Sequence, residues 1–197
     1  MIQLTRVQQT LLFVGLVAIL FITRGHHAPL GLTLPDATLA TFFIGGVFLR
    51  SSIYMIGMFI IAGLVDYLAF SSGVSTFCIT TATGSISVSY LFLIPAYAVM
   101  WFAGEWFRKI NREKLSSLGI LGLVLFSSTL IAFIISDYSF YFFSGKFDGV
   151  NLNDYTQKII SVPGYLSGYF GYTFLYVSLA VLIYTISTKL HKVKSKA

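Results

Sequence analysis

Long runs of apolar residues with few charged side chains constrain the fold of this chain more than any other feature. A helix needs about 20 largely apolar residues to cross the hydrocarbon core of a membrane. Six segments approach that length: Arg6–Thr23, Pro35–Leu49, Ser52–Phe70, Ile86–Phe107, Leu115–Ile135 and Tyr165–Ile186. The runs are too long for the strands of a membrane barrel and do not alternate as such strands do. The sequence therefore predicts an all-α, polytopic membrane protein with six transmembrane helices.

The composition agrees with this class. Only 10% of the 197 residues are charged, whereas about 25% are charged in a typical soluble domain. The length predicts one transmembrane domain over residues 1–197. The net charge of +6 does not indicate nucleic-acid binding, because the basic residues lie at the ends of the apolar runs. The expected partner of the surface is the lipid bilayer.

The positions of the basic residues predict the orientation of the six helices. Short cytoplasmic loops of membrane proteins are enriched in Lys and Arg. If the N-terminus is inside, all of the 13 Lys and Arg residues fall on the cytoplasmic side except Arg24, Lys146 and Lys158. Both termini are therefore expected in the cytoplasm. We read the first segment as a retained helix, since no small-residue cleavage pattern follows it.

Two local features refine this topology. A continuous helix through the second and third segments would place Arg50 in the bilayer, at a cost of about 2.5–3.5 kcal/mol. Two helices joined by a tight turn avoid that cost. In the connection between the fourth and fifth segments, Glu105 and Glu113 lie at helical spacing from Arg108, Lys109 and Arg112, so ion pairs are expected there.

Most of the unusual side chains are expected on the outer side. His26 and His27 lie in the first outer loop, and Asp66 lies about one turn before the outer end of the third segment. Tyr90 lies in the first turns of the fourth segment. An ionisable residue within a span is a functional candidate, although water or a nearby Tyr would also satisfy Asp66. Aromatic residues concentrate in 137–172, where they either anchor the membrane interface or line an apolar pocket.

Cys78 is the only cysteine and lies in a Ser/Thr/Gly-rich outer loop just before a helix. It has no cysteine with which to form an intramolecular disulfide or a zinc site. A helix N-terminus lowers the pKa of a thiol and favours the thiolate, which is a soft ligand for transition metals. An inert loop thiol is the other interpretation.

The order of these features resembles the BtuM family of bacterial vitamin B12 transporters, which are related to the substrate-binding S-components of energy-coupling-factor transporters. The resemblance rests on the His-bearing loop RGHHAPLGLTLPD, on Asp66 in GLVDYLAF and on Cys78 in STFCITTATGSISVSY. It implies an S-component-like bundle in the inner membrane and a cobalamin site open to the periplasm. It also implies that Cys78 ligates the cobalt and removes cyanide from cyanocobalamin, with Asp66, Tyr90 and one of His26 and His27 contacting the ligand.

The first segment departs from the S-components that dock on a shared energising module. Those often carry an A-x-x-x-A pattern, where this chain reads GLVAILFI. The departure favours a solitary transporter without a dedicated module and leaves its energy source open. Three alternatives stay open: an S-component for another vitamin that does not use Cys78, an exosortase-like cysteine transpeptidase and, with less support, a quinone-linked oxidoreductase, which needs paired cysteines.

Overall fold

The computed structural model describes residues 5–24, 34–71, 80–81, 86–110 and 116–194. These residues form seven α-helices and a short 3-10 helix, with no β-strand among them. The elements are α1 (Arg6–Arg24), α2 (Thr38–Phe48), α3 (Ser52–Ser71), η1 (Val88–Phe92), α4 (Leu93–Lys109), α5 (Ser116–Phe143), α6 (Leu152–Ser161) and α7 (Tyr165–Lys194). The prediction of a helical membrane protein is confirmed at this level.

Five of the described helical stretches are long and apolar enough to cross a membrane. They are Arg6–Arg24, Ser52–Ser71, Val88–Lys109, Ser117–Phe143 and Tyr165–Thr188. The second predicted span instead contains α2, with only 11 residues, which is about 16 Å of helix against a hydrocarbon core of about 30 Å. The count of six spans therefore stays a prediction.

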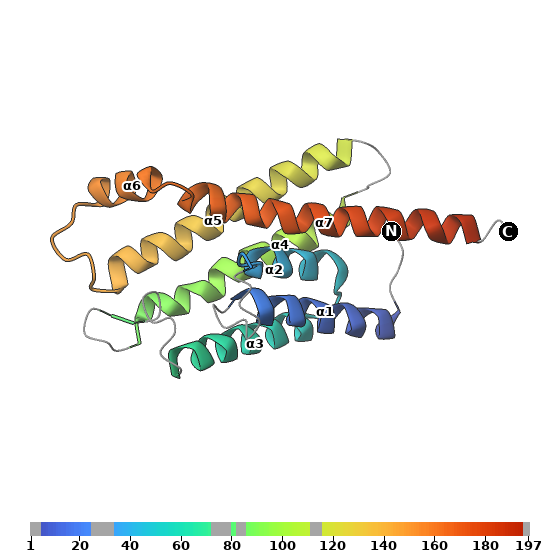
Figure 1. Cartoon of the computed structure of the whole chain (residues 1–197), viewed down its shortest axis with the longest axis horizontal. Coiled ribbons are helices and arrows are strands. Elements are labelled where there is room, and N and C mark those ends of the chain that lie inside the picture. The colour runs from blue at the N-terminus through green and yellow to red at the C-terminus, as the bar shows by residue number, and fades with distance from the viewer. Residues whose placement is uncertain (1–4, 25–33, 72–79, 82–85, 111–115, 195–197) are drawn as a thin grey trace.

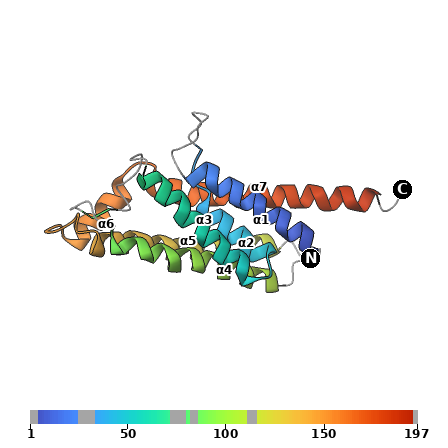
Figure 2. The ribbon, with the colours of Figure 1, turned by 90° about the horizontal axis from the view of Figure 1, so that it is seen from below.

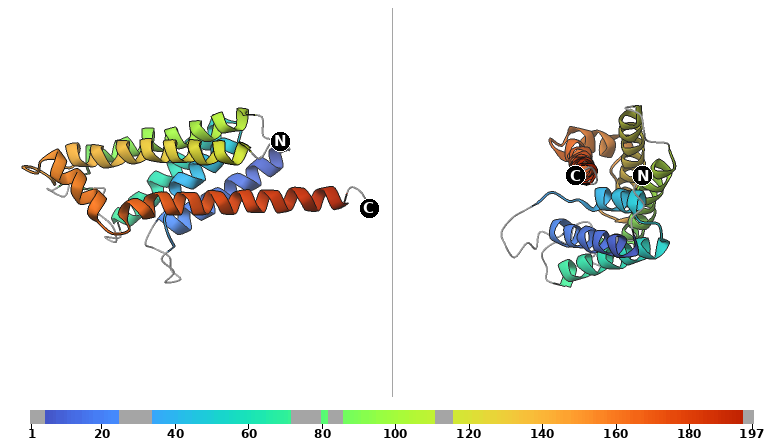
Figure 3. Two further views of the ribbon diagram at one scale, coloured as in Figure 1. Left: turned by 90° about the horizontal axis from the view of Figure 1, so that it is seen from above. Right: turned by 90° about the vertical axis from the view of Figure 1, so that its right-hand side faces the viewer.

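The helices run back and forth along one bundle axis (Figure 1). Helices α1, α3 and α5 run toward the end of the bundle where α6 lies, and α2, α4 and α7 run away from it (Figures 1 and 2). The start of α1 and the end of α7 consequently lie toward the opposite end, beyond which α7 projects (Figure 3). The turn at Arg50 separates α2 from α3 as predicted, because α2 ends at Phe48 and α3 begins at Ser52.

Helix α2 is the centre of the core, and Thr38 to Val47 are all buried. A helix that is apolar on every side is stable only when other elements surround it, and α1, α3, α4 and α7 all pack on α2. Phe42 stacks on Tyr97 of α4 with 5.0 Å between the ring centroids. It also contacts Phe59 of α3 at 4.9 Å.

Side chains from α4 and α7, and that of Asp36 just before α2, close both ends of this helix. At its start, Tyr176 donates to the Pro35 carbonyl at 2.9 Å, and the Asp36 carboxylate accepts from the Thr38 backbone N–H at 2.9 Å. At its end, the Arg108 guanidinium donates to the carbonyl of Leu49 at 2.8 Å and of Gly46 at 3.2 Å. These bonds satisfy backbone groups that a helix terminus otherwise leaves unpaired.

Glu105 pairs with Arg108 and Lys109 at 3.4 Å each, which confirms that part of the predicted ion-pair cluster. Glu113 and Arg112 lie outside the described residues.

Two glycines set the close approach of α2 and α4. A Cβ on Gly46 would lie 2.0 Å from the Trp101 carbonyl oxygen, and one on Gly104 would lie 2.2 Å from the Phe43 carbonyl oxygen. Small residues at such positions let helix backbones meet in membranes. A larger side chain at either position must push the two helices apart.

We expect Gly104→Val to destabilise the bundle, because overpacking a close interface costs about 1–3 kcal/mol or more. The measurement is the thermal unfolding midpoint of the purified protein in detergent. Gly122→Ala in α5 is the matched control, since a Cβ there meets nothing within 4 Å. Equal midpoints for the two variants would contradict the close-packed α2–α4 interface.

Candidate functional site

A cavity of about 800 Å³ lies at the α6 end of the bundle. Its walls come from the ends of α1 and α3, the starts of α2, α4 and α7, and from η1, α5 and α6. The charged residues in its lining are Arg24, Asp36, Asp66, Asp137 and Lys158. The aromatic residues in its lining are Tyr90, Tyr97, Phe140, Phe147, Tyr155, Tyr165, Tyr169 and Tyr172. Large aromatic walls with a few polar groups are typical of small-molecule sites.

Arg24, the last residue of α1, forms a bidentate ion pair with Asp66 of α3. Its Nε donates to Asp66 Oδ1 at 2.8 Å, and its Nη2 donates to Asp66 Oδ2 at 2.6 Å. The side chains are 7% and 13% exposed, respectively. A paired, hydrogen-bonded geometry is what makes two buried charges tolerable. The charge distribution predicts Arg24 only as a basic residue of the outer loop. In the structure it is the last residue of α1 and pairs with Asp66.

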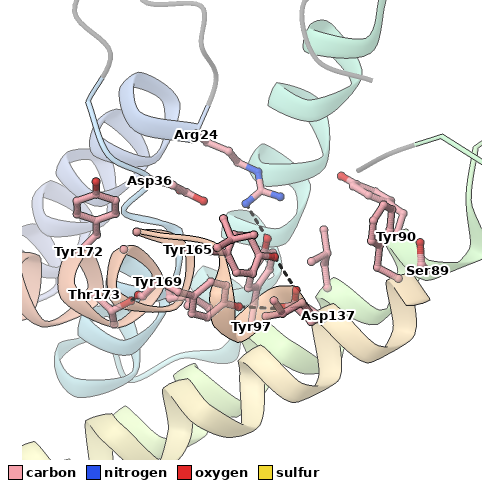
Figure 4. Close-up of a pocket in the computed structure, with 18 of the residues that line it drawn as sticks. Arg24, Asp36, Ser89, Tyr90, Tyr97, Asp137, Tyr165, Tyr169, Tyr172 and Thr173 are labelled. Atoms are coloured by element: carbon pink, nitrogen blue, oxygen red, sulfur yellow. Dashed lines mark hydrogen bonds between the residues drawn. The ribbon is translucent and has the colours of Figure 1, made fainter. Parts of the chain in front are cut away.

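Three hydroxyl groups complete this Arg24 cluster, which we define as Arg24, Thr38, Asp66, Tyr90 and Tyr97. Figure 4 labels its members Arg24, Tyr90 and Tyr97. Arg24 Nη1 donates to the Tyr97 hydroxyl at 2.8 Å and to Thr38 Oγ1 at 2.9 Å. The Tyr90 hydroxyl donates to Asp66 Oδ2 at 2.5 Å. The guanidinium also lies over the Tyr97 ring, 5.1 Å from its centroid. The cluster therefore ties α1, α2, α3, η1 and α4 together at one wall of the cavity.

Asp137 is the centre of a second polar group in the cavity lining. It lies in α5 and is 5% exposed. The Tyr165 hydroxyl of α7 donates to Asp137 Oδ1 at 2.6 Å, and the Tyr155 hydroxyl of α6 donates to the Asp137 backbone carbonyl at 3.1 Å. The predicted fifth span ended at Ile135 and left Asp137 in the outer loop. In the structure α5 continues to Phe143 and carries Asp137 into the cavity wall.

Aromatic contacts build the wall beside Asp137. Phe147 packs on Phe140 at 5.5 Å and on Tyr155 at 4.7 Å between ring centroids. Tyr155 in turn contacts Tyr141 at 4.7 Å. These residues belong to the aromatic-rich outer segment, and the structure gathers several of them around one cavity. The interface-anchor interpretation does not account for their mutual packing.

The predicted site residues fall into two groups. Asp66 and Tyr90 both line the cavity and are hydrogen-bonded to each other. His26, His27 and Cys78 lie outside the described residues. Residues on either side of these segments do line the cavity, namely Arg24 and Asp36 around the histidines and Ala69 before Cys78. Within the described residues, no three His, Cys, Asp or Glu side chains form a group suited to a metal ion.

Comparisons with known proteins give this chain no family. Neither the protein-family models nor the curated proteins contain a match to it. The function must therefore be argued from the residues and the cavity.

The Arg24 cluster predicts how substitutions in the ion pair change the thermal stability of the protein. Arg24→Met leaves the Asp66 carboxylate buried without its partner, and breaking a buried pair in this way costs about 3–5 kcal/mol. The double variant R24M/D66L removes both charges and is expected to unfold at a higher temperature than R24M alone. Thermal unfolding in detergent checks this order. Arg50→Met, at the exposed turn between α2 and α3, is the control, and an effect of R24M no larger than that of R50M would contradict the buried pair.

Proposed function

We propose that the chain binds cobalamin and carries it across the bacterial inner membrane, as a six-span, S-component-like bundle with both termini in the cytoplasm. The observation that carries the proposal is the large aromatic cavity, whose lining residues flank the segments that hold His26, His27 and Cys78. Cys78 is the cobalt ligand in this proposal. The direction of the helices supports the topology, since α1 and α3 run the same way and the chain must return between them (Figure 1).

The size of the cavity is compatible with a small-molecule ligand. Small-molecule cavities span about 300–1,000 Å³, and the volume of about 800 Å³ lies within that range. An S-component for another vitamin is the main competing function, and it differs from the proposal in binding its ligand without Cys78. An exosortase-like transpeptidase would need an arginine free to serve the reaction, whereas Arg24, which lines the cavity, is engaged by Asp66, Thr38 and Tyr97.

The ligation chemistry proposed for Cys78 is a substitution at cobalt. The thiolate sulfur forms a bond to trivalent cobalt, the cobalt–carbon bond to cyanide breaks, and cyanide leaves with both bonding electrons. Cobalt stays trivalent, so no oxidant or reductant is needed. Soft sulfur ligands suit such a metal. Repeated removal of cyanide from successive cyanocobalamin molecules would make the chain an enzyme as well as a transporter.

The geometry changes the role that we give to Asp66. Both of its carboxylate oxygens accept hydrogen bonds from Arg24, and Oδ2 also accepts from Tyr90. In the proposal Asp66 therefore positions Tyr90, and the Tyr90 side chain contacts the corrin. One of His26 and His27 supplies a further contact.

Purification from cells supplied with cobalamin should give a protein with a corrinoid absorption spectrum altered by sulfur ligation. Cys78→Ser should keep the fold and lose the sulfur-dependent part of the spectrum, because a hydroxyl is a much harder ligand. His26→Ala and His27→Ala should keep the sulfur-dependent spectrum, and the one that loses a ligand contact should bind cyanocobalamin more weakly. A colourless wild-type protein that shows no spectral shift with added cyanocobalamin would refute the proposal.

The orientation has a separate test, because Cys78 is the only cysteine of the chain. A membrane-impermeant maleimide should label Cys78 in spheroplasts without permeabilisation, and cyanocobalamin should protect it. In a C78A background, Ala197→Cys should react only after the membrane is opened. Labelling of Cys78 only after permeabilisation would place the loop on the other side.

A further inference from the structure

Asp137 differs from the other buried carboxylate of the cavity in having no cationic partner. Asp66 shares its charge with Arg24 in an ion pair of 2.6 Å. Among the described residues Asp137 forms no ion pair. Its carboxylate accepts a hydrogen bond from a neutral group, the Tyr165 hydroxyl, at 2.6 Å. In Figure 4 the Asp137 carboxyl group lies beside Tyr165 on the cavity wall.

The elements around Asp137 present few charges to it. Helix α5 carries no other charged residue. Elsewhere in the cavity lining, Arg24 is engaged by Asp66, and Asp36 is another acid. The lining also includes Tyr155 of α6, Tyr165 and Tyr169 of α7, Tyr90 of η1 and Tyr97 of α4.

Lys158 of α6 is the remaining base in the cavity lining, and it is exposed. An exposed ammonium group is hydrated and screened, so it compensates a buried carboxylate poorly. Asp154, on the same helix, is also exposed and adds a negative charge to that side.

Filling the cavity should change the protonation state of Asp137. Asp137 is 5% exposed and lines the cavity, so water in the empty cavity can still reach its carboxylate. A bulky ligand that displaces this water leaves a buried charge without a counter-ion, which costs several kcal/mol unless the group becomes neutral. Uptake of one proton removes the charge, and the Tyr165 hydroxyl can still hydrogen-bond to the resulting acid.

We propose that Asp137 is a proton-binding site coupled to occupation of the cavity, so that ligand and one proton bind together. The inference rests on the proposed function for the identity of the ligand. A metal cation fits less well, because Asp137 is one carboxylate among hydroxyl groups and the described residues hold no cluster of acids around it.

This coupling gives a source of energy to a transporter without an energising module. Linkage is reciprocal: if the ligand raises the affinity for a proton, a proton raises the affinity for the ligand by the same factor. In the proposed orientation, the lower pH on the outer side of the membrane favours binding of the ligand and the proton. The higher pH of the cytoplasm favours release of both. Within the pH range where only the complex is protonated, the affinity changes by about tenfold per pH unit.

The proposal is tested by the number of protons that wild type, Asp137→Asn and Lys158→Gln exchange when the ligand binds. Binding of cyanocobalamin is followed by calorimetry in buffers of different ionisation enthalpy, which gives the number of protons exchanged. Because ligation by Cys78 can itself release a proton, the readout is the difference between variants. Wild type should take up about one proton more per ligand than D137N, and K158Q should behave like wild type. Equal proton exchange in wild type and D137N, with binding intact, would overturn the inference and leave the proposed function standing.

A second measurement needs no ligand, so it separates the two proposals if cyanocobalamin does not bind. Infrared spectra of the protein in nanodiscs, recorded from acid to neutral pH, should show a carboxylic-acid carbonyl band that is missing in D137N. Tyr165→Phe removes a hydrogen bond to the ionised group and should move the appearance of that band to higher pH. A spectrum that D137N leaves unchanged at every pH would show that Asp137 binds no proton.

Discussion

The ion pair between Arg24 and Asp66 is the interaction on which the arrangement around the cavity depends. A guanidinium group in an apolar bundle needs a partner for its charge and its donors, and Arg24 takes them from α3, α2 and α4. Helices α1 and α3 otherwise contact the rest of the bundle mainly through α2. The cluster therefore fixes these two helices against α4 at the level where the cavity begins. The Thr23 hydroxyl of α1, which accepts from the Ala37 backbone N–H at 3.2 Å, adds a further polar contact beside the charge pair.

The shortness of α2 creates the space for the cavity. Its first turn lies deep in the bundle, where Tyr176, eleven residues after the start of α7, reaches the Pro35 carbonyl. A helix long enough to cross a membrane would continue past this point and occupy the volume that Asp36 and Leu39 now line. In lipid, a helix can end at such depth only if its backbone groups find partners in the protein. Asp36, Tyr176 and Arg108 supply these partners.

Apolar runs and the charge distribution were enough to predict the five long helices and the turn at Arg50, because both follow from the cost of placing polar groups in lipid. They did not predict α6. The same reasoning misplaced Arg24 and Asp137. A hydropathy argument ends a helix before a charged residue, but α1 includes Arg24 and α5 continues through Asp137, because Asp66 and Tyr165 provide partners for them. A sequence signal for the pair did exist, since Asp66 within a span calls for a nearby base. The mutual packing of Phe140, Phe147 and Tyr155 had no such signal, because it depends on the fold.

Asp66 and Asp137 show how neighbouring groups separate structural from functional acids in the cavity lining. Asp66 is the acid within a predicted span, yet its ion pair with Arg24 makes it part of the scaffold. Asp137 accepts a hydrogen bond from the Tyr165 hydroxyl and forms no ion pair among the described residues, so its protonation state depends on what else occupies the cavity. A carboxylate in an ion pair can hold the cavity wall in place, but it responds little when a ligand enters the cavity. An acid without a counter-ion can convert the arrival of a ligand into the uptake of a proton, and the position of Asp137 in the cavity wall places it where that conversion would be needed.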